Sequence, residues 1–301
     1  MVIKAISRFQ IRINDQNSVG VTLIHYWGSN MTITDKLQDP ATLLADRHGR
    51  VELLTLNRAK SRNSLSEDMI DQLFAEFQRI GQNKTTRVVV LASTGTVFCA
   101  GHDLKELEAH RQDPDSGREF YVRIFAKCSA LMQSIANLPQ PVIACVQGVA
   151  TAAGCQLVAT CDLAVAANDS RFAAPGVDIG LFCSTPMVAL SRNVTPKHAL
   201  EILLTGELIS AEHAYRIGLV NKVVESGKEL EHSLALAEKI AQKSGRALRT
   251  GKKAFYEQTH LSLSEAYDYA SNIMVENLLD LDAKEGICAF LEKRLPNWQE
   301  D

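Results

Sequence analysis

The segment 141–167 of this 301-residue chain, PVIACVQGVATAAGCQLVATCDLAVAA, is its longest nearly uncharged run, and Asp162 is the only charge in it. Its first residues, 141–146, are apolar and rich in β-branched side chains, which is typical of a fully buried strand. Gly148 interrupts the strand, and small residues follow. Beyond them, apolar residues recur at helical spacing (Cys155, Leu157, Val158 and Cys161). The run therefore predicts a buried strand, a tight turn and a buried helix, around which the rest of the chain packs.

The predicted turn is suited to binding a ligand oxygen. The first N–H groups of the helix lack intrahelical partners, the positive end of its dipole lies beside them, and small side chains let an oxygen approach. A membrane span is the alternative, because the run exceeds the roughly 20 residues that a bilayer needs. Proline, glycine, glutamine and Asp162 interrupt the run and no basic flank anchors it, so no membrane span is expected.

Composition excludes several classes of function. A hydrophobic content of 46% and a charged content of 22% are ordinary for a globular protein. The formal net charge of -3, without a dense basic stripe, argues against a nucleic-acid partner. The seven cysteines form no C-x-x-C pair, which indicates buried thiols in a reducing compartment. The eight histidines show no metal-ligand spacing, so no metal site is predicted.

The chain divides into three predicted parts. Residues 1–45 form an N-terminal extension, in which Lys4, Arg8 and Arg12 lie among apolar and hydroxyl residues. This composition resembles a mitochondrial transit segment, and a disordered or structural extension is the alternative. Strands alternate with helices over residues 46–228, which predicts an α/β core, whereas residues 229–301 show a helical pattern alone.

Within this division, strands are expected at 51–56, 88–92, 141–146, 162–167 and 220–224, and helices at 64–80 and 120–136. Ser64 with Glu67, and Asp282 with Glu285, have the spacing of capping boxes at helix starts. The polar segment 103–118 is expected to be a surface loop or lid.

Three motifs lie along this predicted core. The first is FCAGHDLK at 98–105, the second runs from PVIA at 141 to GC at 155, and the third combines LTGE and ISA within 204–211 with GLV at 218–220. Together they resemble the enoyl-CoA hydratase/isomerase (crotonase) family over residues 51–298. The resemblance implies a spiral of β-β-α turns and a C-terminal helical region that forms a homotrimer or a dimer of trimers. It also implies an acyl-CoA thioester ligand and no cofactor beyond the coenzyme A of that substrate.

The resemblance assigns the thioester oxygen to two backbone N–H groups, those of His102 and Ala153. Preorganised donors stabilise an enolate, and losing one typically costs roughly 2.7–4 kcal/mol of barrier. The family usually has glycine where Ala153 stands, and the added methyl group leaves the donor in place. For the His102 ring, the alternative is a partly exposed loop histidine without chemistry. The motifs place further residues at the substrate: Ala100, Gly101, Asp103, Leu104, Lys105, Gly154 and Cys183.

The two glutamates that activate water in family hydratases map to Gln156 and Gly176. Glutamine cannot serve as a carboxylate base and glycine has no side chain, so we expect an oxyanion hole without its acid/base pair. Restoring both glutamates together is expected to raise hydration. Asp178 is a candidate for a displaced acid, and a solvated turn residue or helix cap is its alternative.

Three classes of function follow from this pattern. The first is an acyl-CoA enzyme with altered acid/base groups. A decarboxylase is one example, since the Gly-His-Asp sequence at 101–103 of this chain also occurs in family decarboxylases. The tyrosine that those enzymes use maps near Cys183, so that match is incomplete. The second is an acyl-CoA-binding protein without turnover. The third is an oligomeric interaction protein that retains only the fold.

Overall fold

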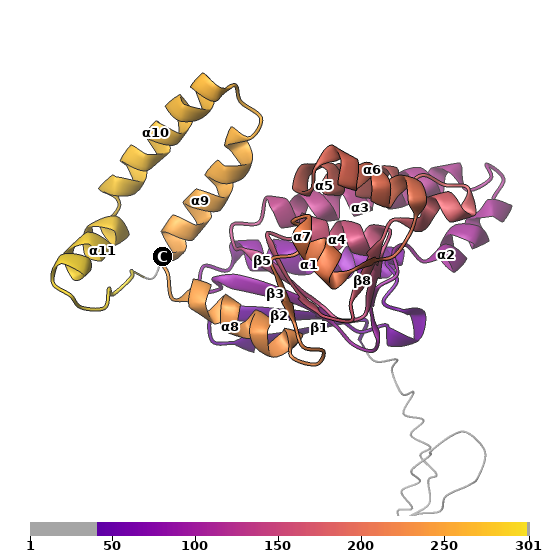
Figure 1. Ribbon diagram of the computed structural model, residues 1–301, viewed down its shortest axis with the longest axis horizontal. Helices are drawn as coiled ribbons and strands as arrows, with labels where there is room; N and C mark the ends of the chain where they lie inside the picture. Colours follow the sequence, from indigo (N-terminus) through magenta and orange to yellow (C-terminus); the bar gives the residue numbers. More distant parts are fainter. Residues whose placement is uncertain (1–40, 300–301) are drawn as a thin grey trace, which may run out of the picture. The chain divides into compact units, whose positions relative to one another are not determined.

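The computed structural model describes residues 41–299, so the predicted transit segment lies outside the described residues. Within 41–299 the strands form two sheets (Figure 1). The larger sheet has the order β1 (Leu43–His48), β2 (Val51–Leu56), β3 (Val88–Ser93), β5 (Val142–Val146), β7 (Leu163–Ala167) and β10 (Lys222–Val224). The smaller has the order β4 (Val97–Cys99), β6 (Val149–Thr151), β8 (Arg171–Ala173) and β9 (Ile209–Ser210).

The chain alternates between the two sheets. After β3 it enters β4, after β5 it enters β6, and after β7 it enters β8, and β3, β5 and β7 pair in parallel, as do β4, β6 and β8. Helices α3 (Arg118–Ala136) and α4 (Ala153–Thr160) make the return connections. This is a spiral of β-β-α turns, and the predicted α/β crotonase-like fold is confirmed.

The central strands of the larger sheet, β2, β3, β5 and β7, are buried on both faces. Alternate residues of β3, Val89 and Leu91, pack with α1 (Glu67–Gln82) and α3 in the larger core. The intervening Val88 and Val90 form a second core with α8 (Glu229–Ala241), which Figure 1 shows beside the sheet. Because strand side chains alternate between faces, α8 covers the face opposite to α1 and α3. Helix α8 therefore shares a hydrophobic core with the sheet. The expected boundary at residue 228 between an α/β core and a helical C-terminal region stays a prediction.

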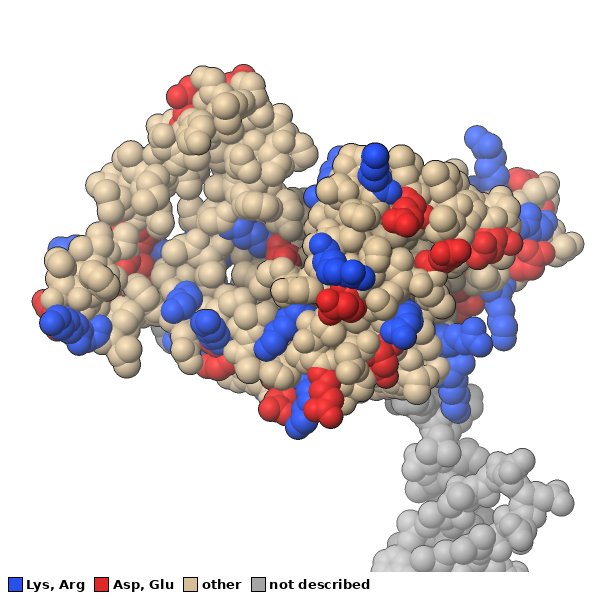
Figure 2. All heavy atoms as spheres, in the orientation of Figure 1, with Lys and Arg blue, Asp and Glu red and all other residues tan. Residues whose placement is uncertain are grey.

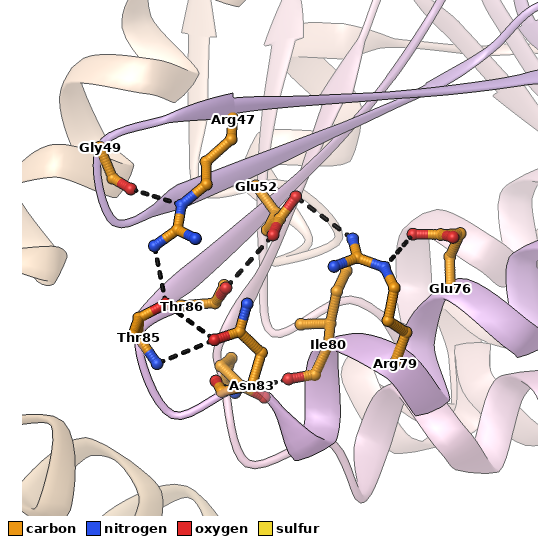
Figure 3. Close-up of polar contacts among 10 residues, drawn as sticks. Arg47, Gly49, Glu52, Glu76, Arg79, Ile80, Asn83, Thr85 and Thr86 are labelled. Carbon is orange, nitrogen blue, oxygen red and sulfur yellow. Dashed lines mark hydrogen bonds and ion pairs between the residues drawn. The ribbon is translucent and has the colours of Figure 1, made fainter.

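A polar cluster joins the end of α1 to the sheet (Figure 3). The buried Glu52 carboxylate on β2 accepts hydrogen bonds from Thr86 Oγ1 at 3.3 Å and Arg79 Nη2 at 3.4 Å. Arg79 also pairs with Glu76 one turn earlier, at 2.8 Å. A buried carboxylate is tolerated where its oxygens have such partners. The cluster thereby fixes the register of α1 against β2.

Three helices follow α8: α9 (Gly245–Gln258), α10 (Leu263–Leu279) and α11 (Leu281–Leu291), and α10 and α11 pack against α9 and each other (Figure 1). Lys252 of α9 ties this region to the core, because its Nζ lies 2.6 Å from Asp162 Oδ2 and donates to the Ile135 and Gln140 carbonyls. Asp162 also accepts from the Val142 N–H at 2.7 Å. Asp162 therefore has a structural role, because it joins the start of β5 to α9.

The surface of α10 is unusual for a helix of its length. None of its residues is buried, and its large apolar side chains Tyr267, Met274 and Leu279 are each more than half exposed. Figure 2 shows mainly uncharged side chains over α10, whereas acidic and basic side chains are interspersed elsewhere on the visible face. No helix within 41–299 combines the length and the apolar character that a membrane span requires.

Several local predictions were wrong. The cap of α1 is Ser66, whose side chain accepts from the Met69 N–H, and not Ser64. The last helix is capped by Asp280, and the capping box of this region is Ser262 with Glu265. The expected loop 103–118 contains the helix α2 (Leu104–Ala109), because Asp103 caps it. The remaining helices of the core are α5 (Ser184–Asn193), α6 (Pro196–Thr205) and α7 (Ala211–Arg216).

Candidate functional site

Two turns from separate parts of the chain touch each other. One follows the C-terminal end of β4 at Gly101, and the other follows the C-terminal end of β6 at Ala152. A Cβ placed on Gly101 would lie 2.9 Å from the Ala152 Cβ and 3.2 Å from the Ala153 nitrogen. A Cβ on Gly154 would overlap the Cys99 carbonyl oxygen. Glycine is therefore required on both sides of the contact, and this is the physical basis of the two glycines in the motifs.

Each turn leaves one backbone donor free. Among the described residues, neither the His102 N–H nor the Ala153 N–H donates a hydrogen bond. The residues on either side of His102 are held, because the Gly101 oxygen accepts from Leu65 N at 2.8 Å and Asp103 N donates to the Leu65 oxygen at 3.2 Å. Ala153 is the first residue of α4, where the helix itself supplies no partner. Two unused donors thus lie on touching turns.

The turn before α4 contains a strained residue. Ala152 has φ 49° and ψ -120°, a left-handed conformation that L-residues other than glycine rarely adopt. Such strain costs of order 1–3 kcal/mol and is common where a backbone group is aimed at a ligand. Sequence reasoning singled out Ala153 as the departure from glycine, whereas the strain is at Ala152.

The His102 side chain is enclosed between the turn and α3. Both of its ring nitrogens are buried without a hydrogen-bond partner, and the ring meets Phe125 edge to face with 5.1 Å between centroids. Burial is the main cause that lowers the pKa of His102 to about 4, against a smaller opposing effect of the nearby Leu65 backbone. The ring is therefore neutral near pH 7. The residue as a whole is partly exposed, as its alternative interpretation expected, but its two ring nitrogens are buried.

The two positions to which the resemblance assigns the family glutamates hold no carboxylate. Gln156 is 4% exposed, and its Oε1 has no hydrogen-bond partner among the described residues. Gly176 lies in the 3-10 turn Pro175–Ile179, and a Cβ there would lie 2.9 Å from Cys183 Sγ. Burial raises the pKa of the Cys183 thiol, so the group next to Gly176 is a neutral thiol and a weak nucleophile.

The other predicted site residues have different surroundings. Asp103 accepts from Lys105 N, Ser64 Oγ and Arg58, so it acts as a helix cap. Burial alone raises the pKa of Asp103, but the hydrogen bonds from Ser64 and Arg58 outweigh it and hold the pKa below its usual value. Leu104 and Lys105 at the start of α2 are exposed, and the Ala100 carbonyl accepts from the Thr151 hydroxyl.

Asp178 is exposed in the same 3-10 turn as Gly176. Its carboxylate oxygens lie 3.2 Å from the point where Gly206, at the C-terminal end of α6, would carry a Cβ. This places Asp178 against the end of a helix, and its role as a displaced acid stays a prediction.

Comparison with known proteins agrees with this architecture. The sequence profile of the family described as enoyl-CoA hydratase/isomerase matches residues 46–301. The chain is 46% identical over 259 residues to enoyl-CoA hydratase domain-containing protein 3, mitochondrial, of Xenopus laevis, which covers 86% of both chains.

Two crystal structures have the same fold. The human enoyl Coenzyme A hydratase domain-containing protein 3 superposes with a TM-score of 0.82 at 44% identity, over 86% of this chain and 100% of that one. An enoyl-CoA hydratase of Mycobacterium smegmatis gives a TM-score of 0.82 at 50% identity, over 86% and 99%. The mitochondrial name of the Xenopus relative agrees with the localisation predicted from the N-terminal segment. The fold, the paired turns and these matches together show that the chain belongs to the enoyl-CoA hydratase/isomerase family.

Proposed function

We propose that this protein binds acyl-CoA thioesters in mitochondrial acyl-CoA metabolism and stabilises enolate character at the thioester, while hydrating enoyl-CoA substrates poorly. The observation that carries the proposal is the pair of unused N–H groups at His102 and Ala153. A thioester oxygen between them would receive two hydrogen bonds in a site that is already organised. The positive end of the α4 dipole adds to the stabilisation.

Hydration requires more than this oxyanion hole. Water has to lose a proton as it adds to the β-carbon, and the α-carbon has to gain one, and each such transfer group contributes typically 10²–10⁴-fold in rate. Gln156 can hydrogen-bond a water but cannot accept its proton, and Gly176 offers no side chain. We therefore expect crotonyl-CoA hydration to be orders of magnitude slower than in family hydratases.

The binding half of the proposal can be tested without any substitution. Butyryl-CoA and its thioether analogue S-butyl-CoA differ in the carbonyl oxygen alone. If the two N–H groups bind that oxygen, calorimetry on the full chain will show at least about tenfold weaker binding of the thioether, since each hydrogen bond contributes about 1 kcal/mol. Equal affinities would mean that the thioester lies elsewhere.

The catalytic half is tested by loss of enoyl absorbance from crotonyl-CoA at saturating enzyme. Hydration at the rate of a family hydratase would overturn the proposal, and Asp178 would then be the first residue to replace. Tight binding of a panel of acyl-CoA thioesters without turnover of any would identify the protein as a binding homologue.

Decarboxylation of a malonyl-type thioester is the second candidate, because it needs an oxyanion hole and no base at the α-carbon. The bond between the α-carbon and the carboxylate breaks, its electron pair enters the thioester as an enolate, carbon dioxide leaves, and a proton from water completes the product. The absence of a carboxylate at Gln156 and Gly176 favours this reaction over hydration. Release of carbon dioxide from methylmalonyl-CoA or malonyl-CoA would identify it, and an unchanged substrate would exclude it.

The assembly is proposed to be a homotrimer or a dimer of trimers. The exposed apolar residues of α10 and α11, such as Leu279, Phe290 and Leu291, form surface that a monomer leaves in water. Light scattering at micromolar concentration measures the assembly directly. A monomeric mass would contradict this part of the proposal.

A further inference from the structure

Two neighbouring helices outside the candidate site bring together His198, Glu201 and His213. His198 and Glu201 lie three residues apart on α6, and His213 lies on α7. One potential ligand atom of each residue lies within 4.8 Å of those of the other two. Among residues 41–299, this is the one group of three histidine, cysteine or acidic side chains with that arrangement.

The distances within this cluster are close to those around a metal ion. Nitrogen and oxygen ligands about 2.0–2.2 Å from a tetrahedral zinc ion lie about 3.3–3.6 Å from one another. The His198 Nδ1 and Glu201 Oε2 atoms are 3.5 Å apart. The rings of His198 and His213 meet edge to face, 5.9 Å between centroids. Because the three ligand atoms all lie within 4.8 Å of one another, any remaining gap is at most about 1 Å, which rotation about side-chain torsions can close.

The backbone beneath the three side chains is fixed. Ala199, Ile202 and Leu203 of α6 are buried in the core, as are Ala211 and Ala214 of α7. At the start of α7, the Ser210 side chain accepts a hydrogen bond from the His213 N–H at 3.1 Å. The side chains of His198 and Glu201 are 40% and 58% exposed, so solvent can enter the remaining coordination positions. The ligands are thus held on rigid helices at an open surface.

We propose that His198, Glu201 and His213 bind a divalent transition-metal ion, with zinc as the best fit and water completing its coordination. Two imidazoles and one carboxylate are the ligand set of many open zinc sites. Imidazole nitrogen also disfavours magnesium and calcium, which prefer oxygen ligands. The competing arrangement is a simple ion pair between His198 and Glu201 with the His213 ring edge to face against His198, which needs no metal ion.

The test uses the full chain without a polyhistidine tag, stripped with EDTA and titrated with zinc chloride in a calorimeter. We expect one zinc ion per chain, no heat from magnesium chloride, and a melting temperature raised by about 5 °C when zinc exceeds its Kd about a hundredfold. His198→Gln and His213→Gln should each weaken zinc binding more than about tenfold. Removing a residue that only hydrogen-bonds to a metal ligand already costs about tenfold, and removing the ligand itself should cost more.

Two controls separate this site from other zinc-binding groups. His260→Gln changes an exposed histidine between α9 and α10 and should leave zinc affinity unchanged. Cobalt(II) bound at the cluster should give tetrahedral absorption bands without the thiolate charge-transfer band that cysteine ligands produce. If wild type binds no zinc at micromolar concentration, or if zinc binding survives in the His198→Gln/His213→Gln double variant, the proposal is overturned.

Discussion

The Cys183 sulfur occupies the space into which a side chain at Gly176 would project. A Cβ on Gly176 would lie 2.9 Å from Cys183 Sγ and 2.9 Å from the Leu181 carbonyl oxygen, both shorter than real Cβ contacts allow. The local fold of this chain therefore leaves no room for a side chain at Gly176, the position to which the resemblance assigns a family glutamate. Restoring both glutamates alone, which the sequence suggested would raise hydration, is not expected to place the second carboxylate correctly.

Gly176→Ala tests this contact at the smallest scale. Overpacking a buried position costs typically 1–3 kcal/mol, and we expect a loss of stability in that range. Cys183→Ala in the same chain removes one of the two obstacles, so the double variant should be more stable than the sum of the single effects predicts. Urea unfolding of the four proteins gives the interaction energy. Strictly additive changes in the free energy of unfolding would mean that the Cys183 side chain moves aside without cost.

Ala152→Gly is expected to stabilise the fold by about 1 kcal/mol, because glycine relieves the strain of the positive φ at the cost of a more flexible unfolded chain. Ala159→Gly is the matched control. Ala159 is buried within α4 and has helical geometry, so glycine there should destabilise by about 1 kcal/mol. Thermal unfolding of both variants measures the two signs, and a loss at both positions would show that Ala152 is not strained.

His102→Leu separates the ring from the backbone donor. Burial holds the pKa of His102 at about 4, below its ordinary 6.5, so between these values the unfolded chain binds a proton that the folded chain does not. The folded state therefore loses stability as pH falls from 6.5 toward 4, and His102→Leu should remove this part of the pH dependence. Urea midpoints at pH 7 and pH 5 measure it.

The same variant keeps its main-chain N–H. We expect its affinity for butyryl-CoA to change less than about tenfold, because the proposed donor to the thioester oxygen is unaltered. His260→Gln, at an exposed histidine, should leave both measurements unchanged. A pH dependence in His102→Leu equal to that of wild type would locate the acid sensitivity in other groups.

Lys252→Met should loosen the attachment of the C-terminal helices. The Lys252 side chain is 7% exposed and pairs with Asp162 at 2.6 Å, and breaking a buried pair by removing one partner typically costs 3–5 kcal/mol. Hydrogen exchange in α9, α10 and α11 should quicken together with this loss. Lys253→Met, at a side chain that is 74% exposed, is the control and should have little effect.

The sequence was most informative where local pattern and tertiary packing agree. The apolar run at 141–167 predicted β5 and α4, because a segment buried on every side has few alternatives, but the expected tight turn between them contains the strand β6. It was less informative at helix ends. Ser64 has the spacing of a cap, but its hydroxyl donates to Asp103, and the neighbouring Ser66 caps α1 instead.

The features that sequence could not predict depend on contacts between distant segments. The closure of Gly176 by Cys183 depends on how the six intervening residues fold back, and the pattern gives no sign of it. His198 and His213 lie on different helices joined by a short strand, so no ligand spacing appears along the chain. The positive φ of Ala152 is equally hidden, because alanine gives no signal for a left-handed turn.

A binding site whose donors are main-chain groups evolves differently from one made of side chains. Substitution at His102 or Ala153 changes what surrounds the N–H but does not delete it, whereas the glycines at 101 and 154 cannot vary without separating the two turns. Mutation can therefore exchange the acids and bases around such a site while recognition of the same chemical group is inherited intact. Lineages built on this frame are free to lose one reaction and acquire another without first losing their ligand.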